Sequence, residues 1–365
     1  MVEELHFSLP ITFAWYDADR LPMFERRGLA EPVSRCQTTI PNLMQITNLD
    51  SRVPSDQPIL IEDIQICLCA IQSQIWHQSR SSMDQSEQDM SVVLQRNTVR
   101  RQLDTIYHRL VLYSTQKVDK NTLGEEEHIP LKFYFGIEDH GRPGWESLVL
   151  IRLKGLIFDA LMLYHLLSLQ LCLNTRTLIE LAKDTKTANP YIIFGEKYEE
   201  ARKQRESMTR TWVKTPSARR ALWHATEILL SHDFTSQDLD THFETPDPIA
   251  YIALSASAMV IWAFCLFGLN SCDECSSAQT RFPPSGGPVI ELAKLGGVMC
   301  RYSSDEKDKI AWIEMGVDCR VLLDGIQLCR CSVDSLLSRF RKYLPDGWKN
   351  VNGVAPEILQ TRPRA

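Results

Sequence analysis

The sequence predicts an all-α protein, in the form of a large helical bundle with irregular loops. Apolar residues recur at helical spacing in several long segments, and strand-like alternation is almost absent outside residues 129–137. The chain has 365 residues, of which 44% are hydrophobic, so it is long and apolar enough to bury a substantial core. We therefore expect helices that pack against helices.

The first third of the chain predicts two amphipathic helices behind a proline-rich entry segment. Four prolines before residue 52 limit that segment to short helices. Residues 57–78 and 92–113 each carry an apolar stripe at helical spacing. The stretch 79–91, rich in Ser, Gln and Asp, is predicted to be the loop between them.

A second loop, 119–146, ends in a Gly-Arg-Pro-Gly turn and precedes a long apolar helix over 147–173. Further on, Thr215 is expected to cap a helix whose first residue is Pro216 and which runs to about residue 231. Residues 245–248 similarly open an apolar helix over 249–269.

The rest of the chain is predicted to hold loops at 271–288, helices near 289–295 and at 332–343, and a tail at 346–365. Residues 1–365 are taken as essentially one domain, within which 1–118 and 145–345 are candidate subdomains.

Composition excludes some classes of function. The net charge is only −6, so the chain is not expected to bind nucleic acid on its own. Its eleven cysteines are scattered among helical patterns, which fits a reducing compartment.

The segment 249–269 is uncharged and long enough to cross a bilayer, so the alternative is a membrane-associated helical protein with spans near 147–173 and 249–269. A buried core helix is favoured, because Lys/Arg clusters flank neither end.

Two groups of residues are candidates for a binding site. Cys272 and Cys275 have the two-residue gap that lets both thiolates bind one zinc ion. The nearest candidates for the second pair are Cys300, Cys319 and the pair Cys329 and Cys331, whose single-residue gap is unusual for zinc. The densest basic cluster, interleaved with Trp212 and Trp223, consists of Arg210, Lys214, Arg219 and Arg220. It is either a solvated helix face or a contact surface for phosphate, an import receptor or a partner protein.

No enzyme is expected. The sequence contains no phosphate-binding Gly-rich loop, nucleophile elbow, His-Glu-x-x-His motif or dinucleotide fingerprint. The sequence also lacks the ligand spacing of a two-Cys, two-His zinc finger and that of a six-Cys binuclear cluster.

One stretch carries a family resemblance. Residues 212–225, Trp-Val-Lys-Thr-Pro-Ser-Ala-Arg-Arg-Ala-Leu-Trp-His-Ala, resemble a segment of the fungal-specific transcription factor domain, as found in regulators with two-Cys, two-His fingers. The helix that follows is similar to the same family at Asp247, Pro248, Tyr251, Trp262 and Gly268. A weaker similarity joins Leu9-Pro10 to Trp15.

The resemblance implies an α-helical regulatory module that works in the nucleus and modulates transcription by RNA polymerase II. It brings no catalytic or cofactor residues, and it places zinc only in a finger region that this sequence lacks. The partners it implies are other transcription regulators, a DNA-binding subunit or a second copy of the chain. Direct DNA contact and membrane association are not expected.

Overall fold

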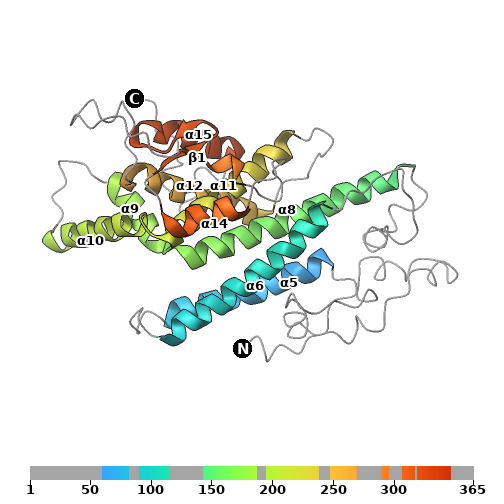
Figure 1. Ribbon diagram of the computed structural model, residues 1–365, viewed down its shortest axis with the longest axis horizontal. Coiled ribbons are helices and arrows are strands. Elements are labelled where there is room, and N and C mark those ends of the chain that lie inside the picture. The colour runs from blue at the N-terminus through green and yellow to red at the C-terminus, as the bar shows by residue number, and fades with distance from the viewer. Residues whose placement is uncertain are drawn as a thin grey trace. The chain divides into compact units, whose positions relative to one another are not determined.

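The computed structural model describes residues 60–81, 90–115, 143–186, 195–237, 247–268, 289–295, 306–316 and 319–346. Most of them are helical, which confirms the all-α class. The chain divides into two compact units. Unit 1 comprises Met1–Leu167 with Asp240–Pro246, and unit 2 comprises Ser168–Leu239 with Asp247–Ala365. Figure 1 shows the described helices along the chain.

Unit 1 contains α5 (Ile61–Ser81), α6 (Met90–Thr115) and most of α8 (Trp145–Cys172). These helices confirm the predictions for 57–78, 92–113 and 147–173. In Figure 1, α5 and α6 lie side by side. The ring of Tyr107 on α6 stacks on the ring of Tyr164 on α8, with 4.8 Å between centroids, so aromatic packing joins the second and third helices of this unit.

Unit 2 is built around the central helix α12 (Pro248–Phe267). The helix begins within the predicted opening at 245–248: Asp247 caps it by accepting a hydrogen bond from the Ile249 amide, and Pro248 occupies the first turn. Helices α9 (Thr175–Lys186), α10 (Glu196–Trp212), α11 (Pro216–Gln237) and α15 (Val333–Tyr343) pack against it. α14 (Glu306–Met315) packs on α11.

α12 is almost entirely buried by its own chain, since only Pro248 and Ile252 among its residues are exposed. By length and composition it is the one helix of the described residues that could cross a membrane, and 83% of its most apolar window is buried. α8 and α9 pass the same test only as a pair, which is bent by 79°. This extent of burial is typical of the core helix of a globular protein.

Three helices of unit 2 were not predicted: α9, α10 and α14. They are rich in charged residues and bury few apolar side chains, so no long apolar run marks them in the sequence. α9 buries Leu178, Leu181, Ala182 and Asp184, and α14 buries Trp312 and Ile313. Tertiary packing supplies the stability that a short polar helix lacks by itself.

A small sheet corrects the prediction of helix near 289–295. Val289–Glu291 forms strand β1, and only the following Leu292–Lys294 forms a turn of 3-10 helix, η4. β1 pairs in parallel with β2 (Arg320–Leu323), which pairs antiparallel with β3 (Ile326–Gln327). The β2–β3 turn has φ of 50° at Asp324 and 75° at Gly325. Positive φ at both central residues is the backbone of a type I′ hairpin, for which Asp-Gly is a preferred sequence.

Element boundaries differ from the prediction by a few residues. The 79–91 loop is shorter than expected, because α5 continues to Ser81 and α6 begins at Met90. α11 extends past residue 231 to Gln237, and α12 ends at Phe267. The entry segment, the run 129–137, the loop 271–288 and the tail beyond residue 346 lie outside the described residues.

Candidate functional site

The four basic residues of the candidate contact patch lie around the connector between α10 and α11. Arg210 is in the last turn of α10, Lys214 is in the connector, and Arg219 and Arg220 are in the first turns of α11. Arg210 and Lys214 are exposed, whereas Arg219 and Arg220 are half-buried. The patch thus lies where two helices meet, and its two solvent-exposed cations are Arg210 and Lys214.

Arg219 on α11 forms hydrogen bonds to α14 and to the connector between α10 and α11. Its Nε donates to the carbonyl of Ile313 at 2.8 Å, and its Nη1 donates to the carbonyl of Lys214 at 2.9 Å. Both acceptors lie at helix ends, where carbonyls lack partners within the helix. Gly316 follows α14 with φ of 58°, and a Cβ there would lie 2.6 Å from the Arg219 guanidinium. Burial lowers the pKa of Arg219 from its usual value.

The other two arginines also have partners within unit 2. Arg220 forms an ion pair with Glu314 at 2.8 Å, and Arg210 lies over the ring of Phe267 at 5.3 Å from its centroid. A cation on an aromatic face keeps its outer side in water. Arg210 and Lys214 are therefore the members of the patch best placed to meet another molecule.

The segment that carries the family resemblance is the joint between α8, α10 and α11. Trp212 Nε1 and Ser217 Oγ both donate to the carbonyl of Cys172, at 2.9 and 3.1 Å. Thr215 accepts a hydrogen bond from the Ala218 amide at 3.1 Å, which confirms it as the N-cap of α11. The indole of Trp212 also meets the ring of Phe264 edge to face.

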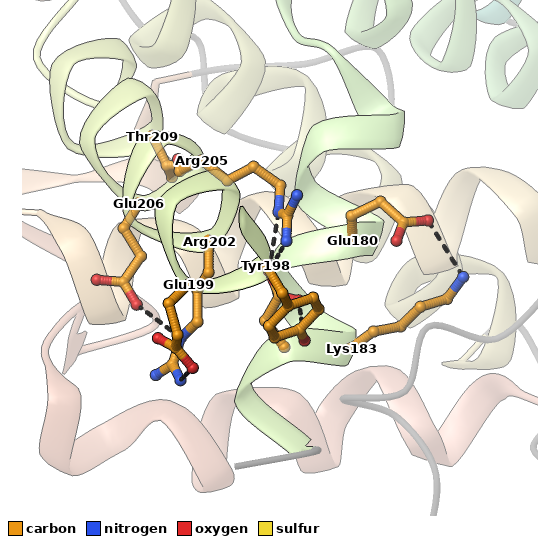
Figure 2. A network of polar contacts seen from close by, with 9 residues as sticks. Glu180, Lys183, Tyr198, Glu199, Arg202, Arg205, Glu206 and Thr209 are labelled. Carbon is orange, nitrogen blue, oxygen red and sulfur yellow. Dashed lines mark hydrogen bonds and ion pairs between the residues drawn. The ribbon is translucent and has the colours of Figure 1, made fainter. Parts of the chain in front are cut away.

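A buried carboxylate joins α9 to α10. Asp184 is 3% exposed and accepts a hydrogen bond from the Tyr198 hydroxyl at 2.6 Å. Arg205 donates to its other oxygen through Nε at 2.8 Å and Nη2 at 2.6 Å. Figure 2 shows Tyr198 and Arg205 reaching from the same face of α10. The sequence analysis did not find this network, although Tyr198 and Arg205, seven residues apart, share one face of a helix.

A second network of hydrogen bonds and ion pairs joins the sheet to α11 and α15. The Glu291 carboxylate accepts the amides of Asp324 and Gly325, both at 2.9 Å. Arg339 on α15 then bridges Asp324 to Asp233 at the end of α11, with 2.6 Å to each carboxylate. The Asp324-Gly325 turn between two apolar runs is the signal from which the hairpin could have been found.

The ionisable residues His224, Glu227 and His232 of α11 are buried. Burial raises the pKa of Glu227 to about 8, against a smaller opposing effect of Lys309. Burial lowers the pKa of His232 to about 4, so its imidazole is neutral at pH 7. Its ring stacks on Tyr343 with 5.5 Å between centroids. Titratable groups with shifted pKa values are typical of functional sites, though buried packing produces them too.

The cysteine pair proposed from its spacing lies outside the described residues, as does Cys300. Cys319, Cys329 and Cys331 are described and form no disulfide. Among the described residues no three His, Cys, Asp or Glu side chains are grouped closely enough to hold a metal ion.

Comparison with known proteins returned no match: no protein-family model, curated protein or solved structure resembles this chain significantly.

Proposed function

We propose that the chain is a nuclear regulatory domain of a fungal zinc-finger transcription factor, which modulates RNA polymerase II transcription by binding another protein or an effector. The observation that carries the proposal is the resemblance of residues 212–225 to the regulatory domain of that family. The same segment joins α8, α10 and α11 through Trp212, Thr215 and Ser217. A helical module with exposed cations beside this joint suits binding better than chemistry.

The membrane alternative rests on α12, the apolar helix. A span that faces lipid exposes apolar side chains, whereas 83% of the most apolar window of α12 is enclosed by its own chain. We therefore favour the regulatory reading, in which α12 is the core of unit 2.

A tethered reporter assay tests the proposal. The full chain is fused to an unrelated DNA-binding domain, and transcription of a reporter with that domain's sites is measured against the domain alone. We expect the intact chain to raise or lower transcription several-fold. Leu254→Asp, which places a charge at a fully buried position of α12, should abolish the effect.

The patch itself is tested by charge reversal. Lys214→Glu should reduce the reporter effect while leaving the circular dichroism spectrum unchanged. Lys203→Glu, at an exposed position of α10 away from the patch, is the matched control and should have no effect. A fusion that folds, enters the nucleus and leaves the reporter unchanged would overturn the proposal.

A further inference from the structure

α14 carries large apolar side chains on two of its faces. Trp312 and Ile313 are buried on the inner face, which packs on α11. On the outer side, Ile310 is 52% exposed and Met315 is 73% exposed. A single exposed apolar residue is ordinary on a protein surface, whereas two on the outer side of one ten-residue helix give that helix a second apolar surface.

The middle of this outer face has a small residue at its centre and opposite charges at its ends. Lys307, Ala311 and Glu314 are all exposed. Their spacings of four and three residues place them in one line along the helix, with Ile310 and Met315 on either side of the line. Because the side chain of Ala311 is short, the backbone of another helix can approach closely at this point.

The order of the charges makes this face complementary to itself. If two copies of α14 pack antiparallel about a two-fold axis between residues 310 and 311, Lys307 of each copy lies opposite Glu314 of the other, since both are equally far from the axis. A parallel pair would instead place each charge beside its own kind. Glu314 is already paired with Arg220 at 2.8 Å, but its side chain is 53% exposed and can accept from a second cation.

We propose that the outer face of α14 binds a second copy of this chain, so that two α14 helices pack antiparallel in a two-fold symmetric dimer. Ile310 and Met315 are shielded from water in this contact, and the two Lys307–Glu314 pairs fix its direction and register. A ten-residue helix offers a small area, so the dimer is weak, with a Kd in the micromolar to millimolar range. The inference does not depend on the proposed role in transcription.

Sedimentation equilibrium of the full chain, from micromolar to near-millimolar concentration, tests the contact. The average mass of the wild type should rise from that of a monomer toward that of a dimer. Ile310→Asp and Met315→Asp each place a charge in the contact and should weaken association about tenfold or more. Both positions are exposed, so the circular dichroism spectrum should not change. Met208→Asp, at a position of α10 that is 52% exposed, is the matched control and should associate as the wild type does.

Charge reversal tests the antiparallel register. Lys307→Glu alone and Glu314→Lys alone each bring like charges together at both pairs of the dimer, so each variant should stay monomeric where the wild type associates. An equal mixture of the two should form a dimer again, because one chain then carries two acids and the other two bases. Glu314→Lys also removes the ion pair with Arg220, but local damage of that kind cannot be reversed by adding the other variant.

Four results would overturn the proposal. The first is a wild type that stays monomeric up to near-millimolar concentration. The second is Met208→Asp weakening association as much as Ile310→Asp does. The third is a mixture of the two charge variants that associates no better than either alone. The fourth is growth beyond a dimer, which would indicate an open contact without a two-fold axis. The wild-type measurement alone can overturn the proposal even if a variant fails to fold.

Discussion

Removing the carboxylate of Asp184 should destabilise unit 2 strongly, because one buried group satisfies two partners on another helix. Its side chain is 3% exposed, while that of Arg205 is 22% exposed. Asp184→Ala leaves the guanidinium and the Tyr198 hydroxyl without their acceptor. Breaking a buried ion pair costs about 3–5 kcal/mol. Water can partly rehydrate Arg205, so we expect about 3 kcal/mol.

Urea unfolding monitored by circular dichroism measures this cost. Glu199→Gln is the matched control, because its contact with Arg202 is 4.0 Å long and exposed, and such pairs contribute roughly 0–1 kcal/mol. A double-mutant cycle between Asp184 and Arg205 isolates the interaction, and we expect a coupling energy of about 1–3 kcal/mol. A loss below about 1 kcal/mol for Asp184→Ala, with no coupling, would refute the reasoning.

Three further changes have defined outcomes. The pKa of Glu227 is raised from 4.5 to about 8, so its stabilising effect is complete below pH 4.5 and is lost as pH rises toward 8. The free energy of unfolding of the wild type should therefore fall by about 3 kcal/mol relative to Glu227→Gln between pH 5 and 8, as measured by denaturant titration at each pH. Gly316→Ala should cost about 1 kcal/mol more than Gly325→Ala. Both glycines have positive φ, but only Gly316 has a side chain in the way, which must give up its hydrogen bonds. Thr215→Ala removes a helix cap and should lower the melting temperature, at a cost of about 1 kcal/mol, whereas Thr211→Ala, which caps nothing, should leave it nearly unchanged.

The long helices could be predicted because their own residues determine them. α8 and α12 carry long apolar runs, and the caps at Thr215 and Asp247 are local signals that need no tertiary contact. α9, α10 and α14 were not predicted, because partners elsewhere in the chain stabilise them. The strand β1 was missed for the same reason, since its three residues pair with β2, some thirty residues away.

The candidate patch was found from sequence as a cluster of charges, but its geometry was not. Adjacent Arg219 and Arg220 look equivalent in sequence, whereas in the structure one bonds carbonyls at two helix ends and the other pairs with Glu314. The Asp184 network joins residues 14 and 21 positions apart on two different helices. Spacing alone does not bring such residues together, because the path of the chain between helices decides it.

Fractionation of cells that express the tagged full chain tests the central claim most directly. We predict that the chain is recovered in soluble nuclear extract without detergent, because α12 is enclosed by its own unit. Recovery only in washed membranes, released by detergent, would make α12 a membrane span and would contradict the assignment as a nuclear regulatory domain.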